Sequence, residues 1–139
     1  MASRSLNDLH QNFQPAATEF LNACRELGYN IIVTCTYRSP DEQQQLYAQG
    51  RTKPGKIVTN AKPGLSAHNF QVNNKPASLA MDIVPLIHGK PIWDSSDPIW
   101  AELGRIGELH SLEWAGRWEG HLKETAHFQI RSLHTYLGD

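Results

Sequence analysis

Residues 29–42 read YNIIVTCTYRSPDE, and this stretch carries the two local signals that decide the fold. Its first eight residues are rich in β-branched side chains, which is typical of a strand. The turn that follows offers Ser39 as a helix cap, Pro40 at the first helical position and two acids at the positive helix end. We therefore expect a strand over residues 29–36 that leads into a short helix ending near Gln49.

Working outward from this stretch, apolar periodicity predicts helices and strands in mixed order. We expect helices over residues 13–27 and 97–110, strands over 79–84 and 127–130, a long surface loop over 51–65 and a turn over 85–91. Regular βαβ repeats are absent from this order, so the sequence predicts the α+β class. The expected architecture is a mostly antiparallel sheet flanked by helices.

Composition limits the function classes. A chain of 139 residues is expected to form one small domain over residues 1–139. With 13 basic and 14 acidic residues, the net charge of −1 gives no footprint for nucleic acid. The apolar runs fall short of the roughly 20 residues that span a bilayer, so stable membrane insertion is not expected. The first residues lack a secretory signal, so we expect cytoplasmic synthesis.

Cys24 and Cys35 are expected to be buried thiols, although a disulfide bridge between them stays an open alternative.

Three residues from separate elements are candidate metal ligands. Asp82 lies in an apolar strand, where a carboxylate needs a partner, either backbone N–H groups, an Arg or a metal. His68 ends the long loop and His127 begins the last strand. A lone His is more often a surface or core residue, but two imidazoles and one carboxylate suit a catalytic zinc with an open fourth position.

Other residues suggest chemistry around such a site. Glu124 precedes His127 by three residues and is either a general base or a solvated acid. Arg38 directly follows the first strand, where it could clamp a carboxylate or a developing oxyanion, or form a surface salt bridge. Trp114 and Trp118 flank a Gly-containing turn and suit either a substrate-binding wall or the core.

Five landmarks occur in an order that resembles a known family. They are Thr36-Tyr37-Arg38-Ser39, Ser66-Ala67-His68-Asn69, Ala80-Met81-Asp82, Glu113-Trp114-Ala115-Gly116-Arg117-Trp118 and Glu124-Thr125-Ala126-His127-Phe128. Over about residues 6–131, the chain resembles zinc peptidases of the D-alanyl-D-alanine carboxypeptidase group, of the VanY and endolysin type. It looks closest to the phage-type L-alanyl-D-glutamate endopeptidases.

This resemblance implies one zinc ion per chain, at the sheet. The implied ligands are His68, Asp82 and His127. Glu124 would be the general base, and Arg38 would steady the substrate or the transition state. Ser66 and Trp118 would contact the substrate, while His121 is the next candidate for a proton carrier should Glu124 be a bystander.

The chain departs from the family pattern Ser-x-His-x-x-Gly-x-Ala-x-Asp. Gln71 stands where Gly is expected, and residues 72–78, VNNKPAS, are inserted. We expect the insertion to form a hairpin around Asn73 and Asn74 that returns the chain to the strand carrying Asp82. The assignment of Asp82 depends on that return.

The resemblance predicts a peptidase that hydrolyses the L-Ala–D-Glu bond of the peptidoglycan stem peptide, in endolysin-like wall lysis. A D-Ala–D-Ala carboxypeptidase or dipeptidase is the alternative, and a non-catalytic zinc-containing binding module of the hedgehog type is a different class. A metal-free domain also stays open. We expect a monomer that is released to the periplasm, with a holin as the export route.

Overall fold

The computed structural model describes residues 2–59, 61–120 and 123–137, with Leu137 as backbone only. Its main sheet runs in the order β1 (Asn30–Cys35), β4 (Ala80–Ile87), β7 (His127–Ile130) and β6 (Leu112–Trp114), and β5 (Lys90–Pro91) also pairs with β4. These strands are antiparallel wherever they pair. The α+β class with a mostly antiparallel sheet is therefore confirmed.

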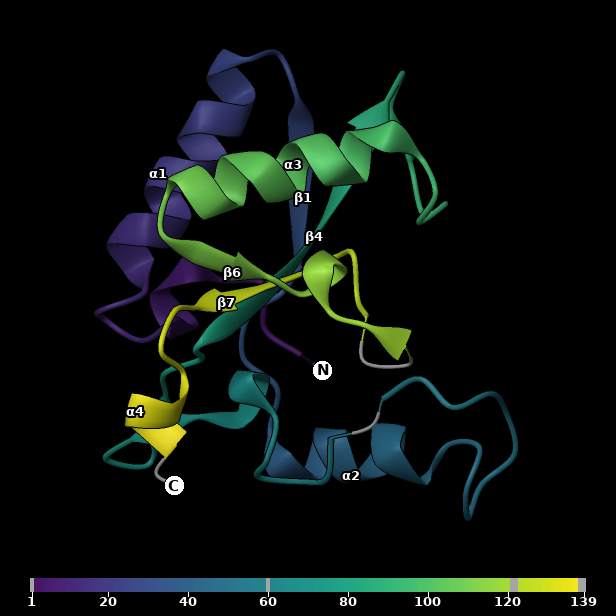
Figure 1. Cartoon of the computed structure of the whole chain (residues 1–139). Helices are drawn as coiled ribbons and strands as arrows, with labels where there is room; N and C mark the ends of the chain where they lie inside the picture. Colours follow the sequence, from purple (N-terminus) through teal and green to yellow (C-terminus); the bar gives the residue numbers. More distant parts are fainter. Residues whose placement is uncertain (1, 60, 121–122, 138–139) are drawn as a thin grey trace.

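Two amphipathic helices cover one face of this sheet, namely α1 (Gln14–Glu26) and α3 (Pro98–Leu109), as Figure 1 shows. Both begin with a proline in the first turn, and Asp97 caps α3 by accepting a hydrogen bond from the Ile99 N–H. The helices and the sheet enclose the main core. Its largest fully buried side chains include Phe13, Phe20, Leu21, Met81, Ile83, Trp100, Leu103, Ile106, Leu112 and Phe128.

Close packing between α3 and the sheet requires a helix residue without a side chain. A Cβ atom built on Gly104 would lie 2.2 Å from the Trp114 ring. The Trp114 ring is part of the core, with 6% of the residue's surface exposed, so it has little room to move away from the helix. Glycine is thus needed at position 104 for the close approach of the helix, despite its low helix propensity.

The short helix α2 (Pro40–Ala48) begins as the sequence predicts. The Ser39 hydroxyl accepts from the Glu42 N–H, and the Glu42 carboxylate accepts from the Ser39 N–H, which is a complete capping box. In Figure 1 this helix lies apart from α1 and α3, beyond the end of the sheet. The loop over residues 51–65 follows it, and the single turn α4 (His134–Leu137) follows the last strand.

The strand boundaries differ from the prediction in two places. The expected turn over residues 85–91 begins late, because β4 continues to Ile87 before it turns at His88 and Gly89 into β5. Pro85 is tolerated within β4, where it pairs with Ile31 and its carbonyl accepts from the Ile92 N–H. The three-residue β6, where the sequence predicts no strand, pairs with β7.

The insertion after His68 forms the expected hairpin. Strands β2 (Gln71–Val72) and β3 (Lys75–Pro76) pair with each other, and Asn73 and Asn74 turn the chain with φ values of 54° and 62°. Positive φ at both central residues is the geometry that tight hairpins prefer, and Asn tolerates it. The hairpin therefore leaves the fold and returns without displacing β4.

Candidate metal centre and substrate cleft

Strand register places Asp82 and His127 side by side. Asp82 on β4 is the cross-strand partner of His127 on β7 and of Cys35 on β1. Directly opposed residues of antiparallel strands present their side chains on one face. Met81 and Phe128, one position away, point into the core instead. Alternation along the strands therefore turns Asp82 and His127 to the face away from α1 and α3.

His68 reaches the same place from the short 3-10 helix η2 (Ala67–Asn69). The Ser66 hydroxyl caps this turn by accepting from the His68 N–H. The imidazole Nε2 lies 3.2 Å from Asp82 Oδ1. Its Nδ1 lies 2.8 Å from the Thr36 carbonyl oxygen, which only accepts, so Nδ1 carries a proton. Nε2 of the neutral ring is consequently the nitrogen free to bind a cation.

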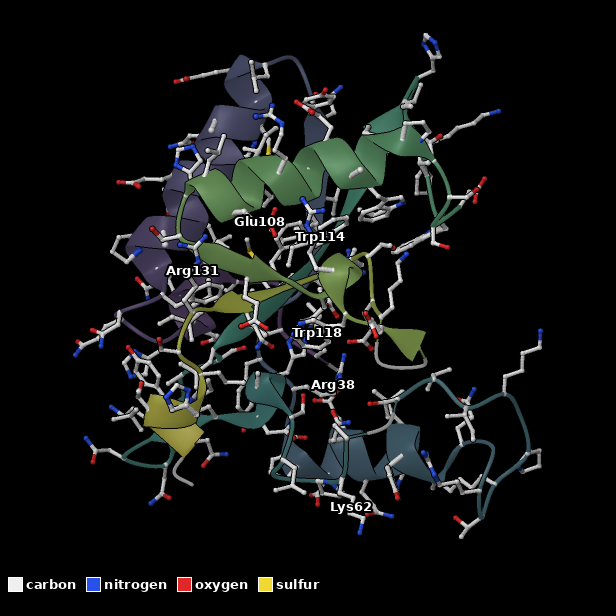
Figure 2. The ribbon with its side chains drawn as sticks, viewed as in Figure 1. Arg38, Lys62, Glu108, Trp114, Trp118 and Arg131 are labelled. Atoms are coloured by element: carbon white, nitrogen blue, oxygen red, sulfur yellow. The ribbon has the colours of Figure 1, made fainter. Side chains whose placement is uncertain are left out.

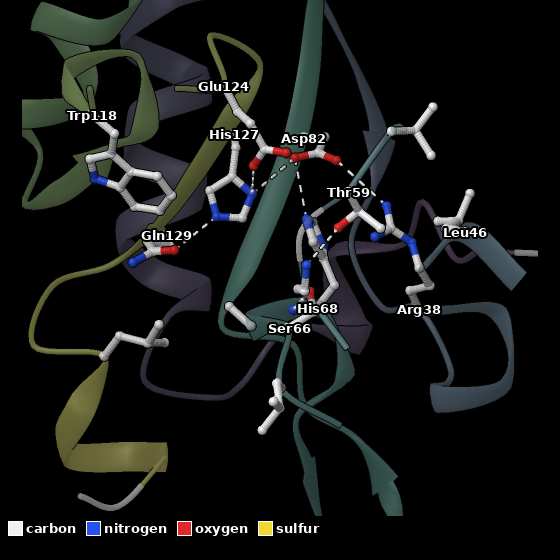
Figure 3. A pocket seen from close by; sticks show the side chains of 15 residues that line it. Arg38, Leu46, Thr59, Ser66, His68, Asp82, Trp118, Glu124, His127 and Gln129 are labelled. Atoms are coloured by element: carbon white, nitrogen blue, oxygen red, sulfur yellow. Dashed lines mark hydrogen bonds and ion pairs between the residues drawn. The ribbon is translucent and has the colours of Figure 1, made fainter. Parts of the chain in front are cut away.

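His127 is held in a matching way with its nitrogens reversed. Nδ1 lies 3.3 Å from Asp82 Oδ1, while Nε2 lies 2.8 Å from Gln129 Oε1. An acceptor at Nε2 fixes the proton there and leaves Nδ1 free to bind. In Figure 3, dashed lines join Asp82 to both imidazoles. The structure thus brings together the three residues that the sequence predicts as metal ligands, including Asp82 beyond the insertion.

These three groups form a strongly coupled electrostatic cluster. Burial alone lowers the pKa of His68, but the adjacent Asp82 carboxylate outweighs it and raises the pKa to about 10. Burial likewise raises the pKa of Asp82, yet His68 and His127 outweigh it and lower that pKa well below its usual range. Asp82 is therefore ionised at neutral pH and pairs with a protonated His68, so a metal ion that binds His68 Nε2 must displace the proton held there.

Cys35 is an unexpected neighbour of the cluster. Both cysteines are free and buried, so the bridge between Cys24 and Cys35 does not form. Potential ligand atoms of Cys35, His68 and Asp82 all lie within 4.8 Å of one another, which makes them a second candidate metal group. However, Cys35 Sγ lies 3.7 Å from His68 Nδ1, the nitrogen engaged by Thr36. The cluster with His127 therefore matches the free nitrogens better.

The predicted general base lies at the rim of this cluster. Glu124 Oε2 is 3.9 Å from His127 Nδ1, and its side chain is 48% exposed. The loop that carries it is tied to the 3-10 helix η3 (Ala115–Arg117), since the Glu124 N–H donates to the Ala115 carbonyl. The buried Trp114 adds a second tie, as its Nε1 donates to the Thr125 carbonyl at 2.8 Å. Glu124 is thus positioned beside the cluster but remains open to solvent.

Arg38 is both a site residue and an ion-pair partner. Its Nη1 donates to Gln43 Oε1 at 2.9 Å, and its Nη2 lies 3.8 Å from Asp82 Oδ2. In Figure 3 it lies on the opposite side of the cluster from Trp118. Arg38 and Trp118 are among the residues that line one cavity next to the cluster, and both are also labelled in Figure 2.

Two cavities meet at the cluster. The first, of about 400 Å³, is lined by Arg38, Leu46, Val58, Thr59, Ala61, Leu65, Ser66, Ala67, Trp118, Gln129 and Leu133 together with the clustered residues. The second, of about 490 Å³, is lined by Ser95, Gly120, Lys123, Thr125 and Ala126. Asp82, Glu124 and His127 border both cavities. The cluster therefore lies within a cleft that extends to either side of it.

The remaining predicted residues divide between cleft and core. Ser66 caps η2 and lines the first cavity but is buried, and its contact with a substrate stays a prediction. Trp118 packs near His127, with ring centroids 5.7 Å apart, and lines the same cavity. Trp114 belongs to the core, which settles its two interpretations in favour of packing. His121 lies outside the described residues.

Sequence reasoning missed the two residues that orient the imidazoles, Thr36 and Gln129. Thr36 acts through its backbone carbonyl, so its side chain gives no signal. Gln129 follows His127 by two positions, and a strand period of two does place both on one face. That spacing was the available signal for Gln129.

Comparisons with known proteins place the chain in a family. The model of VanY, D-alanyl-D-alanine carboxypeptidase, matches residues 6–84. The chain belongs to the VanY family. The peptidoglycan L-alanyl-D-glutamate endopeptidase CwlK of Bacillus subtilis is 33% identical over 132 residues, covering 89% of this chain and 74% of CwlK. The predicted metallopeptidase class and family resemblance are thereby confirmed.

Solved structures show the same fold. The Serratia marcescens L-Ala D-Glu endopeptidase ChiX superposes with a TM-score of 0.63 at 19% identity, covering 94% of this chain and 88% of ChiX. A variant of the vancomycin resistance D,D-pentapeptidase VanY from a VanB-type cassette, in complex with Zn(II), gives 0.61 at 18% identity, with 88% and 72% covered. At such identities the likeness concerns the fold of the VanY family.

Proposed function

We propose that this VanY-family chain is a zinc-dependent peptidase that hydrolyses the L-Ala–D-Glu bond of peptidoglycan stem peptides. One observation carries the proposal. His68 Nε2 and His127 Nδ1 converge on Asp82 Oδ1 at 3.2 and 3.3 Å, while the other nitrogen of each ring already has a partner. This is a donor set oriented toward a single point.

The donor set fits one zinc ion. Two imidazole nitrogens and a carboxylate are a common ligand set of catalytic zinc, and they leave a position open at the cleft. Thr36 and Gln129 supply the outer hydrogen bonds that such ligands need. When bound there, zinc polarises a carbonyl and makes a water more acidic. His68, Asp82 and His127 would hold it.

The protein's own residues then divide the work around the scissile peptide. Glu124, half exposed beside His127, accepts the proton of the attacking water and returns it to the leaving amine. Arg38 presents its guanidinium to the first cavity, where it stabilises negative charge that develops on the carbonyl oxygen. Ser66 and Trp118 hold the peptide in that cavity. A proton acceptor at the rim favours an enzyme over a non-catalytic zinc module.

The shape of the cleft favours cleavage within a peptide. An endopeptidase must bind substrate residues on both sides of the reacting bond, whereas a carboxypeptidase needs room for one terminal residue beyond it. Here cavities of about 400 and 490 Å³ flank the cluster. The curated relative CwlK is named for the L-alanyl-D-glutamate bond, which supports the same choice. The D-Ala–D-Ala carboxypeptidase is the second candidate, since the matching family model carries that description.

We further propose that the protein acts on the wall from the periplasm, as a monomer with one peptidase domain over residues 1–139. No helix in the described ranges is long and apolar enough to cross a bilayer. Release through a holin and a role in lysis belong to this proposal. The stem peptide is its expected partner.

The deciding experiment is digestion of purified muropeptides followed by mass spectrometry. We expect products split between L-Ala and D-Glu, and loss of that activity after a chelator removes the metal. Chelation should also lower the melting temperature, because a ligand of the folded state stabilises it. Release of terminal D-Ala alone would instead favour the carboxypeptidase. Full cleavage by metal-free protein would contradict the zinc mechanism.

A further inference from the structure

The second cavity holds a lysine that the proposed mechanism leaves unused. Among the described residues that line this cavity, Lys123 is the only lysine or arginine, and Glu124 follows it in the chain. Its backbone is ordered by a hydrogen bond from its N–H to the Gly120 carbonyl, and its side chain is exposed. The cavity is therefore a space of about 490 Å³ beside the cluster, with an exposed lysine among the residues of its wall.

Two arginines, on α3 and on η3, form ion pairs, whereas Lys123 does not. Arg105 forms an ion pair with Glu102 at 2.6 Å, and Arg117 forms one with Glu108 at 2.9 Å. Within the described ranges, no carboxylate lies within ion-pair distance of Lys123. An unpaired cation in a cleft can bind an anionic group of a ligand at little desolvation cost.

Arg38, on the other side of the cluster, is less available for this task. It donates to Gln43 Oε1, contacts Cys35 Sγ and lies 3.8 Å from the ionised Asp82. Its charge is thus partly offset by Asp82, and its position is fixed by three neighbours. The two ends of the cleft therefore differ, with a constrained cation in the first cavity and a free one in the second.

The chemistry of the proposed substrate supplies a matching anion. Glutamate has two carboxyl groups, and a peptide continues through only one of them. A second carboxylate therefore remains free on the D-Glu residue, a few bonds from the nitrogen released by cleavage. Where the chain carries an amide at that position instead, the negative charge is lost.

We propose that Lys123 is a specificity residue that binds the free carboxylate of D-Glu in the second cavity, so that the leaving part of the peptide lies there. This inference rests on the proposed function. It places the L-Ala side of the substrate against Arg38, Ser66 and Trp118 in the first cavity. It also makes the enzyme discriminate between stem peptides with a free and an amidated D-Glu.

The test compares two purified stem peptides that differ only in this carboxylate or amide, each with wild type and Lys123→Gln. Wild type is expected to prefer the free acid. In Lys123→Gln, kcat/KM on the acid should fall about tenfold, mainly through KM, while the value on the amide stays within about twofold. Lys123→Arg should restore most of the preference. Lys90→Gln, at the far end of the sheet on β5, is the matched control and should change neither value.

The possible outcomes distinguish a failure of the Lys123 inference from a failure of the proposed function. Preference for the acid that is lost in Lys123→Gln and regained in Lys123→Arg supports the inference. Cleavage of both peptides by wild type, with a preference that Lys123→Gln retains, overturns the inference alone. Equal losses on both peptides also overturn it, because they indicate a structural role of the loop. If wild type cuts neither peptide, the proposed function itself fails.

Discussion

The three clustered residues and the loop that carries Glu124 are held in opposite ways. Asp82 and His127 lie on paired strands, and each imidazole has a fixed hydrogen-bond partner on its far side. Glu124 lies on a loop that is held by individual backbone hydrogen bonds, among them those from its own N–H and from Trp114 Nε1. His127 is buried, whereas the Glu124 side chain is 48% exposed.

This difference matches the two tasks that the proposed function assigns to these residues. A metal site works only when its ligands stay within a few tenths of an ångström, which sheet register and outer hydrogen bonds provide. A proton carrier must approach first the water and then the leaving amine, so a less constrained loop suits it. The comparison therefore predicts that changes in the cluster abolish metal binding, while changes in the loop lower turnover and leave the metal in place.

The largest effect is expected from Asp82→Ala, which removes the carboxylate shared by both imidazoles. Zinc content should fall from one per chain to near zero, and cleavage should fall below detection, because two neutral nitrogens hold the ion poorly. Metal analysis and muropeptide digestion measure the two results. Asp94→Ala, at an exposed aspartate, should retain both. Tight binding of one zinc by Asp82→Ala would mean that Cys35 or another group replaces it.

Glu124→Gln should have the next largest effect, and it should separate chemistry from metal binding. The amide keeps the size of the side chain but cannot accept a proton, so turnover should fall about a hundredfold or more. Zinc content and KM should change little, since the loss lies in the transition state. Glu119→Gln, an exposed acid on the same segment, serves as the control. A variant that cleaves at nearly the wild-type rate would show that Glu124 is a bystander.

A smaller effect is expected from Trp114→Phe, which tests how the loop is supported. Phenylalanine keeps an aromatic ring in the core but loses the hydrogen bond to the Thr125 carbonyl. Losing that bond and some packing should lower the free energy of unfolding by about 1 kcal/mol or slightly more. Turnover should fall roughly threefold because Glu124 is less well positioned. Urea unfolding and kcat check this, with the exposed Trp93→Phe as control. Zinc content should stay unchanged. A loss of zinc would contradict this prediction, because it would mean that Trp114 supports the clustered residues and not only the loop.

Local signals in the sequence predicted most of the elements. Ser39 and Pro40 start α2, Asp97 starts α3, and the Asn73–Asn74 turn closes the inserted hairpin, because each depends on neighbouring residues alone. The strand β6 was missed because three residues are too few to show a period. Its existence depends on pairing with β7, a contact distant in sequence.

The site shows the same division between local and distant information. The resemblance pointed to the residues that bear chemistry, and the structure brings them together. The residues around them could not be predicted from the sequence. Thr36 acts through its backbone carbonyl, and Cys35 lies opposite Asp82 because of an irregularity in the β1–β4 pairing. Which nitrogen of each imidazole is free likewise follows only from three-dimensional contacts.

The hairpin inserted between His68 and Asp82 has a practical consequence. Its exposed strands form a two-stranded sheet of their own, and the Ala77 N–H donates to the Phe70 carbonyl where the chain rejoins the fold. Lengthening a closed surface loop costs little, since closure entropy grows only slowly with length. The turn at Asn73 and Asn74 is thus an insertion point for a fluorescent reporter or a wall-anchoring module that should leave His68 and Asp82 in place.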